Sequence, residues 1–307
     1  MSIIDKPDPC YLRFWGVRGS YASPFESHLG VGGNTSCVEL RAGDSLLVCD
    51  AGTGIIPLGE HILSNDAPRE LLVLMTHYHW DHICGLPFFV PAFRRDWRVR
   101  FFGPGRDAQE IERSIAAQMK APYFPVETEN WQADIDYVEP QCEGLRHGPF
   151  LIRHGSVHHP GVTYGYRITI ADRTVVYVSD NEFRFLDRSL ASAGDLSDED
   201  HAIFRSVSSE ERVAELALIR DADILIHDAQ YTEEAYITKR GWGHSCYLDT
   251  VDAAIDAGVR LLYLFHHDPG NDDRIVEEML VRARALIAER GSSLQCEIAR
   301  EGLVVSL

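Results

Sequence analysis

The sequence predicts an α/β protein in which sheets and helices are stacked in layers. Short apolar runs rich in β-branched and aromatic residues recur along the 307 residues, and helical patterns lie between some of them. Several of these runs are unbroken rather than alternating, which is typical of strands covered on both faces. Strands that interleave with helices in this way favour a layered α/β architecture.

Ten apolar runs are predicted to be strands, because each is bounded by glycine, aspartate, asparagine or a charged residue. In chain order they are Tyr11–Trp15, Cys37–Leu40, Leu46–Cys49, Leu71–Met75, Val99–Phe102, Tyr164–Ile170, Thr174–Val178, Ile224–Ile226, Leu261–Phe265 and Leu303–Val305.

The last helical pattern is the clearest. Asn271 and Asp272 can cap its start, and Gly291 is expected to end it. Two further helices are expected at Gln109–Lys120 and Asp249–Ala257. One face of the last helix is apolar, formed by Ile275, Met279, Leu280, Ala283, Leu286 and Ile287.

We expect residues 1–307 to form one domain, since no linker rich in proline, glycine or serine divides the chain. The segment 181–223 separates two predicted strands and holds eleven acidic against five basic side chains. It is expected to be a partly helical insertion that acts as a lid or a subunit contact. A solvated surface excursion explains the same composition equally well.

The charge of the chain limits its partners. The formal net charge is −18, and no run rich in lysine or arginine is present. A groove for a long nucleic acid needs a basic stripe that neutralises phosphates, so such a partner is not expected. A small anion can still be held by bound cations.

The cysteines and the hydropathy pattern favour a cytoplasmic protein. The seven cysteines are irregularly spaced without a CxxC pair, as in a reduced protein rather than a disulfide framework. The first residues lack a signal pattern, and no apolar run approaches the roughly 18 residues of a membrane span.

The densest group of potential metal ligands follows the predicted strand Leu71–Met75. His77, His79, Asp81 and His82 lie within six residues. Three imidazoles and one carboxylate at the end of a strand form a good site for divalent cations. A histidine-rich surface loop is the simpler alternative, but such a loop has no need of this arrangement.

One such group does not complete two coordination shells, and further candidates occur at other strand edges. Asp180 follows the strand Thr174–Val178, and a carboxylate is suited to bridge two ions because each oxygen can bind one. His159 and His266 are the other candidates, with their neighbours His158 and His267 as rivals.

The order of these motifs resembles the metallo-β-lactamase superfamily over nearly the whole chain. A strand leads to Asp50-Ala51-Gly52, and the His77–His82 motif, His159, Asp180 and His266 follow. The resemblance implies an αββα sandwich of four layers with two metal ions at one edge of the two sheets.

The match is closer to the phosphodiesterase branch, which contains tRNA 3′-processing endonucleases and cyclic-nucleotide phosphodiesterases. The stretch 159–168 (HPGVTYGYRI) resembles the third motif of that branch. Stretch 226–231 (IHDAQY) resembles its His-Glu-Ala-Thr motif, with Asp228 in place of glutamate. Stretch 243–246 (GHSC) resembles its His-Ser-Thr motif and contains His244.

The resemblance implies a role for each motif residue. His77, His79 and His159 would hold one ion; Asp81, His82 and His266 would hold the other; and Asp180 would bridge them. Asp228 would orient His244, which would donate a proton to the leaving group, although the shorter aspartate puts that reach in question. Asp81 could also orient the attacking water.

Other residues near the motifs carry weaker signals. Asp50 is expected to hydrogen-bond a ligand or its loop without binding metal. The aromatic residues Phe88, Phe89, Tyr123 and Phe124 could stack a nucleobase, although side chains at such spacings more often belong to the core.

These observations lead to one functional expectation with several alternatives. The chain is expected to be a hydrolase with two divalent ions, zinc first and manganese or iron as alternatives. Its expected substrate is a small phosphodiester such as a cyclic nucleotide, attacked by metal-bound hydroxide. The alternatives are a tRNA 3′-end endonuclease, a lactonase or β-lactamase, and a sensor of metal or nucleotide without turnover. A homodimer is compatible with the sequence, and no membrane partner is expected.

Overall fold

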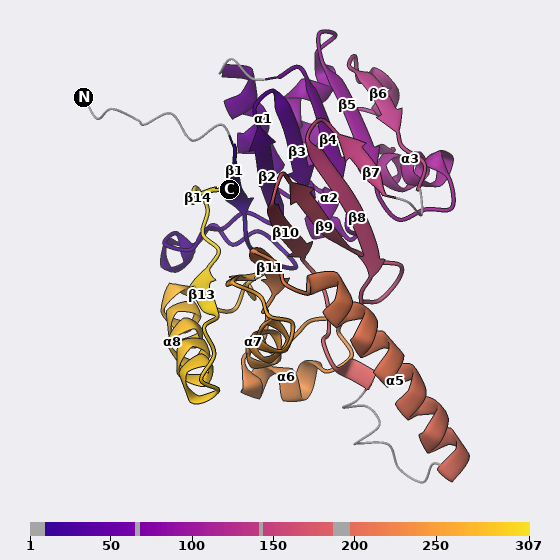
Figure 1. Cartoon of the computed structure of the whole chain (residues 1–307). Coiled ribbons are helices and arrows are strands. Elements are labelled where there is room, and N and C mark those ends of the chain that lie inside the picture. Colours follow the sequence, from indigo (N-terminus) through magenta and orange to yellow (C-terminus); the bar gives the residue numbers. More distant parts are fainter. Residues whose placement is uncertain (1–9, 65–67, 141–143, 187–196) are drawn as a thin grey trace, which may run out of the picture.

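The computed structural model describes residues 10–64, 68–140, 144–186 and 197–307. Within these residues, two seven-stranded sheets form the centre of the molecule (Figure 1). The chain enters the first sheet near its N-terminus and returns to the same sheet with its last strand.

The first sheet has the order β14-β1-β2-β3-β4-β5-β6. Strands β3 to β6 are parallel to one another, whereas β1 pairs antiparallel with β2 and β14. The bounds are β1 Cys10–Gly16, β2 Cys37–Ala42, β3 Ser45–Cys49, β4 Glu70–Leu74, β5 Arg98–Phe102, β6 Asp134–Tyr137 and β14 Val304–Ser306.

The second sheet has the order β13-β12-β11-β10-β9-β8-β7. Strands β10 to β13 are parallel, and β7 to β10 are antiparallel. The bounds are β7 Leu145–His147, β8 Phe150–Ser156, β9 Tyr164–Ile170, β10 Arg173–Val178, β11 Ile224–Asp228, β12 Leu261–Phe265 and β13 Gln295–Ile298.

Helices cover the outer faces of the sheets. Helices α1 and α3 pack against the first sheet, and α5, α7 and α8 pack against the second. The bounds are α1 Ile55–Ser64, α2 Trp80–Ile83, α3 Ala108–Ala116, α5 Asp198–Ile219, α6 Glu233–Lys239, α7 Tyr247–Asp256 and α8 Asp273–Glu289. Short 3₁₀ helices occupy Glu26–His28, Leu86–Phe88, Val90–Phe93, Ala117–Met119 and Thr128–Asn130.

The burial of strand β3 illustrates the four layers. Leu47 and Cys49 belong to the core that includes the interface between the two sheets. Leu46 and Val48, on the opposite face of the same strand, pack in the core beneath α1 and α3. Alternate side chains of one strand are therefore buried in different cores, which explains the unbroken apolar runs. The predicted αββα sandwich is confirmed.

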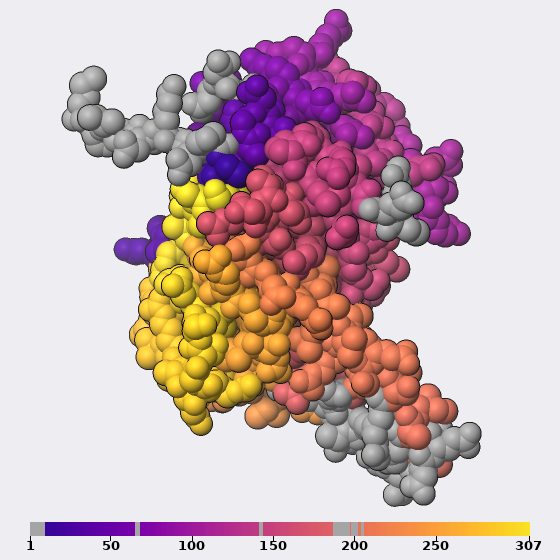
Figure 2. Space-filling model, viewed as in Figure 1, coloured from indigo at the N-terminus to yellow at the C-terminus, as the bar shows by residue number. Residues whose placement is uncertain are grey.

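The acidic segment 181–223 contains helix α5, and residues 187–196 lie outside the described residues. Helix α5 extends away from the body of the molecule (Figures 1 and 2). Its role as a lid or a subunit contact stays a prediction. None of the helices among the described residues is long and apolar enough to cross a membrane.

Candidate metal centre

The candidate residues gather because they lie at the carboxyl ends of parallel strands. Asp50 follows β3, and His77 lies three residues after β4. In the second sheet, Asp180 follows β10, Asp228 ends β11, and His266 follows β12. Parallel neighbours end at the same sheet edge, where side chains on short loops face a common space.

The first group consists of His77, His79 and His159, whose ligand atoms all lie within 4.8 Å of one another. The Nε2 atom of His159 is 2.9 Å from Nδ1 of His79. The Oδ2 atom of Asp180 lies 3.8 Å from Nε2 of His77 and 3.7 Å from Nε2 of His159. These are the residues that the resemblance implied for one ion.

The second group consists of Asp81, His82 and His266, which also lie within 4.8 Å of one another. The Oδ2 atom of Asp81 is 3.2 Å from Nε2 of both His82 and His266. The Oδ1 atom of Asp180 is 3.0 Å from Nε2 of His82 and 3.4 Å from Nε2 of His266. Asp180 thus faces each group with a different oxygen, as a bridging carboxylate would.

The hydrogen bonds around these groups fit a metal centre. Nδ1–H of His159 donates to the Gly243 carbonyl at 2.8 Å, and Nδ1–H of His266 donates to Oε1 of Gln230 at 2.9 Å. Each bond fixes the tautomer and leaves Nε2 directed at the cluster, as in histidine ligands generally. Nε2 of His77 is buried without a hydrogen-bond partner among the described residues. An ion would satisfy this atom, so the donor set fits divalent cations.

Burial and neighbouring charges shift the pKa of His82 in the opposite direction to the pKa values of His77 and His159. Burial lowers the pKa of His159, and burial together with the His82 ring holds the pKa of His77 well below its ordinary value. Neutral imidazoles are the form that binds metal. Burial also disfavours the charged form of His82, but the carboxylates of Asp180 and Asp81 raise the pKa of His82 well above its ordinary value.

The rival histidines point elsewhere. Nδ1 of His158 pairs with Oε1 of Glu211 at 2.8 Å, and its ring stacks on Phe185. Nε2–H of His267 donates to the Ala299 carbonyl at 3.2 Å. The structure therefore brings His159 and His266 to the cluster and leaves His158 and His267 outside it.

Asp228 and His244 form a buried pair beside the cluster. Nδ1 of His244 is 2.7 Å from Oδ2 of Asp228, so the shorter aspartate reaches the imidazole. The same nitrogen is 3.8 Å from Oδ2 of Asp180. The backbone N–H groups of Gln230, Ser245 and Asn181 also donate to Asp228. Burial lowers the pKa of His244.

Asp50 supports the cluster from behind. Its Oδ2 atom accepts hydrogen bonds from Nδ1–H of His82 at 2.9 Å and from the Tyr177 hydroxyl at 2.8 Å. Its Oδ1 atom accepts from the backbone N–H of Thr76. Asp50 and His266 both have a positive φ, at 59° and 58°. Such backbone strain is common at functional sites, where the surroundings hold it in place.

Three residues that help to position the ligands of the cluster were not predicted from the sequence. Gln230 orients His266, and the backbone N–H of Ser20 donates to Oδ2 of Asp81 at 2.7 Å. A Cβ on Gly19 would lie 2.5 Å from the His266 ring, so the glycine leaves room for that ligand. Only the short Gly19-Ser20 turn after the first predicted strand could have signalled these contacts.

The four aromatic residues that could stack a nucleobase differ in how deeply they are buried. Phe89 is fully buried and belongs to the core, whereas Phe88 is 55% exposed and packs edge-on against Phe124. Tyr123 is 82% exposed. Phe124 is partly buried and packs against the same core as Phe89, so these two side chains have the core role that was the alternative for all four.

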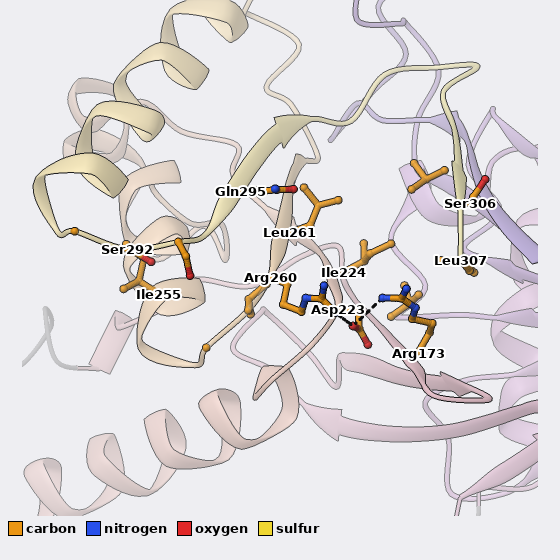
Figure 3. A pocket seen from close by; sticks show the side chains of 16 residues that line it. Arg173, Asp223, Ile224, Ile255, Arg260, Leu261, Ser292, Gln295, Ser306 and Leu307 are labelled. Atoms are coloured by element: carbon orange, nitrogen blue, oxygen red, sulfur yellow. Dashed lines mark hydrogen bonds and ion pairs between the residues drawn. The ribbon is translucent and has the colours of Figure 1, made fainter.

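A separate cavity of about 730 Å³ lies at the amino ends of β10 to β12, opposite the cluster (Figure 3). Arg173 and Arg260 line it, and both pair with Oδ1 of Asp223, at 3.3 and 2.8 Å. One carboxylate therefore partly neutralises both guanidinium groups, and the cavity is distinct from the candidate metal centre.

Comparisons with known proteins agree with this arrangement. The family model described as "Beta-lactamase superfamily domain" matches residues 47–195. This range starts in β3 and contains the His77–His82 motif, His159 and Asp180. The chain has the metallo-β-lactamase fold.

A curated relative matches about three quarters of the chain, and solved structures share this fold over nearly its full length. Ribonuclease Z from Kineococcus radiotolerans is 27% identical over 257 residues, covering 76% of this chain and 78% of the relative. The metallo-β-lactamase fold protein YhfI from Bacillus subtilis has a TM-score of 0.65 at 21% identity, covering 98% of this chain and 100% of the other. A diphosphatase from the PhnP family has a TM-score of 0.62 at 18% identity, covering 97% and 98%.

The comparisons confirm the resemblance to the metallo-β-lactamase superfamily that the motifs indicated. They also confirm the general prediction of a metal-dependent hydrolase. The chain is a hydrolase of the metallo-β-lactamase type, with relatives among the ribonucleases. The cluster of histidines and aspartates is suited to divalent cations.

Proposed function

We propose that this metallo-β-lactamase-fold protein is a phosphodiesterase that uses two divalent cations, zinc first and manganese or iron as alternatives. His77, His79 and His159 would hold one ion, Asp81, His82 and His266 would hold the other, and Asp180 would lie between them. When bound, the ions supply Lewis acidity and make water a stronger nucleophile at neutral pH.

The observation that carries the diesterase assignment is the pair Asp228 and His244. With Nδ1 of His244 held by Asp228 at 2.7 Å, its Nε2 is the atom left to exchange a proton with a substrate. Cleavage of a diester expels an alkoxide, which is a poor leaving group without a proton. A lactone or β-lactam hydrolase has no evident use for such a pair.

His244 protonates the departing oxygen, and the Asp228 carboxylate stabilises the imidazolium before transfer. A negatively charged phosphate beside the ring also favours that protonated form. Asp81 is held by the Ser20 N–H, and its position supports a role in orienting the nucleophile.

The leading substrate class is a small phosphodiester such as a cyclic nucleotide. The charge of −18 supports this choice, because a long polyanion is repelled unless a basic groove receives it. A tRNA 3′-end endonuclease is the second candidate, since the curated relatives are named ribonuclease Z. Such a substrate would make a nucleic acid the partner, whereas the negative net charge of the chain predicts that long nucleic acids do not bind.

The test begins with purified protein loaded with zinc or manganese and analysed for metal per chain. Turnover is then measured on bis(p-nitrophenyl) phosphate, cyclic nucleotides, a lactone and a 3′-extended tRNA transcript. We expect about two ions per chain and diester cleavage. Cleavage of the transcript at its 3′ end with little turnover of cyclic nucleotides would favour the second candidate. Lactone cleavage without diester cleavage, or two ions without any turnover, would contradict the proposal.

A further inference from the structure

The segment that follows Asp180 carries a buried carboxylate that the proposed function does not use. Glu182 lies two residues after Asp180, and its side chain is fully buried. A carboxylate is costly to bury unless hydrogen bonds compensate for the water that it loses. The donors around Glu182 therefore indicate what this side chain holds in place.

The Glu182 side chain binds the helix α6 and the turn that follows it. Its Oε1 atom accepts hydrogen bonds from the Tyr236 hydroxyl at 2.8 Å and from the backbone N–H of Gly241 at 2.9 Å. Its Oε2 atom accepts from the backbone N–H groups of Gly241 and Gly243, both at 2.9 Å. Both glycines have a positive φ, at 83° and 87°, which glycine adopts without strain. One carboxylate thus fixes the turn 241–243.

This turn holds the ring of the candidate ligand His159. The Gly243 carbonyl accepts the Nδ1–H of His159 at 2.8 Å. A Cβ on Gly243 would lie 2.4 Å from that nitrogen, so the turn is in close contact with the ring. The backbone N–H of Glu182 also donates to the carbonyl of His158, the residue before His159, at 2.7 Å. Glu182 therefore fixes His159 twice, through the chain before it and through the acceptor of its ring.

The same turn leads directly into His244, the proposed proton donor. The next residue, Ser245, donates its hydroxyl hydrogen to the Asn181 carbonyl at 2.5 Å and accepts from the backbone N–H of Phe183 at 3.0 Å. The neighbours of Glu182 on both sides thus bind the residue after His244. The segment 181–183 and the segment 241–245 are held together along their length.

We propose that Glu182 is a positioning residue for both His159 and His244. Its carboxylate holds the turn 241–243 where the carbonyl of the turn receives the His159 ring and the end of the turn presents His244. Glu182 acts through these two histidines rather than by contact with the ions or the substrate, as residues behind metal ligands do. The role toward His244 rests on the proposed phosphodiesterase function, whereas the role toward His159 requires only that the centre binds metal.

Two conservative variants separate a positioning role from an effect of charge. Glu182→Gln loses the charge but keeps the length, because its amide oxygen can accept from Gly241 and Gly243 and the Tyr236 hydroxyl can accept from its NH₂ group. Glu182→Asp keeps the charge but is shorter by a methylene group, so it cannot reach all of these donors. Positioning predicts that Glu182→Gln behaves like the wild-type protein and that Glu182→Asp behaves like Glu182→Ala.

The first measurement is the affinity for zinc, obtained by competition with a chromophoric chelator. Glu182→Asp and Glu182→Ala should bind zinc about tenfold or more weakly than the wild-type protein, whereas Glu182→Gln should stay near the wild-type affinity. Glu182→Asp carries the test if Glu182→Ala does not fold. Wild-type affinity in Glu182→Asp, or a loss in Glu182→Gln without a loss in Glu182→Asp, would overturn the proposal.

Glu39→Ala is the matched control for the loss of a buried carboxylate. Glu39 is also fully buried, and it accepts hydrogen bonds from the Tyr11 hydroxyl at 3.0 Å and the Trp15 indole N–H at 2.8 Å, both on β1. Its removal should destabilise the fold and leave the zinc affinity unchanged. An equal loss of affinity in Glu39→Ala would show that loss of stability alone explains the Glu182 variants, and it would overturn the proposal.

The second measurement tests the role toward His244 with metal-saturated protein. We expect Glu182→Asp to lower kcat on a cyclic nucleotide about tenfold more than on bis(p-nitrophenyl) phosphate, because only the alkoxide needs a proton to depart. Equal losses on both substrates would overturn the role toward His244. Absence of diester cleavage in the wild-type protein would instead contradict the proposed function, and the zinc affinities would still decide whether Glu182 positions His159.

Discussion

Asp180 is the side chain at which both halves of the cluster meet. Its two oxygens lie within 3.0–3.8 Å of Nε2 of His77, His82, His159 and His266. A change at this position therefore affects both proposed ions, whereas a change at any one histidine affects a single group directly.

We expect Asp180→Ala to hold fewer than the about two ions of the wild-type protein and to lose diester cleavage by a factor of at least about 10². Metal per chain is measured by elemental analysis after gel filtration, alongside turnover. Glu211→Ala serves as the control, because Glu211 lies on α5 and contacts His158 outside the cluster. A variant that keeps both ions and full turnover would contradict the bridging role.

His244 should behave differently from the ligands. We expect His244→Gln to keep its metal content and to lose turnover most strongly on diesters with alkoxide leaving groups, by about 10²-fold or more. A p-nitrophenolate needs no proton to depart, so the loss on activated esters should be small. Equal losses on both kinds of ester would show that His244 is not the proton donor.

The residues that could be predicted are those that lie in local motifs. His77, His79, Asp81 and His82 are close in sequence and directly follow a strand, so their proximity needed no knowledge of the tertiary structure. Ser20 and Gln230 act through contacts 61 and 36 residues away in the chain, with Asp81 and His266. Such contacts depend on which loops the two sheets bring together, and no local pattern encodes them.

At the scale of elements, the predicted strands correspond to ten of the strands in the structure, but β6, β7, β8 and β13 were not predicted. Strand β6 (Asp134–Tyr137) alternates charged and apolar residues at a sheet edge, and β8 ends in Arg153-His154-Gly155-Ser156. Polar residues are tolerated there because these strands are only partly covered, so the apolar signal is weak. Helix α1 was missed because Pro57 and Gly59 usually interrupt helices, although a proline in the first turn loses no hydrogen bond.

Arg18 connects the loop after β1 to the segment between β12 and α8. It is fully buried, and its guanidinium group donates to the carbonyls of Gly32 at 2.7 Å, Asn271 at 2.7 Å, Asp268 at 3.3 Å and His28 at 3.4 Å. The backbone N–H of the adjacent Gly19 also donates to the carbonyl of His267. The loop that carries Ser20 is therefore fixed beside the ligand His266.

We expect Arg18→Leu to lower the free energy of unfolding by about 3–5 kcal/mol, because it leaves several buried carbonyls without donors. Urea denaturation monitored by circular dichroism measures this change. Arg274→Leu is the matched control: Arg274 is exposed and pairs with Glu278 four residues on, so its loss should cost less than about 1 kcal/mol. Similar losses in both variants would mean that Arg18 does not tie the loops together.

At the scale of the whole molecule, buried histidines make stability depend on pH. Burial lowers the pKa of His227 to about 4 and that of His267 to about 3. Both rings are neutral in the folded protein, where Nδ1–H of His227 donates to the Asp228 carbonyl at 2.8 Å. In the unfolded chain a histidine has a pKa of about 6.5, so between that pH and about 4 the unfolded state binds more protons.

The folded state should therefore be fully stabilised above about pH 6.5 and should lose stability as the pH falls toward 4, by up to about 1.4 kcal/mol per pH unit for each histidine. His227→Gln removes one titrating ring while it keeps a donor and an acceptor at the position, so its stability should fall less steeply over this range. The free energy of unfolding is measured between pH 7 and 4.5 with a chelator present, which excludes the release of metal as the cause. His61→Gln is the control, because His61 is only half-buried and should contribute a smaller slope. Parallel pH profiles for the wild-type protein and His227→Gln would show that acid sensitivity arises elsewhere, most directly from the coupled carboxylates and imidazoles of the cluster.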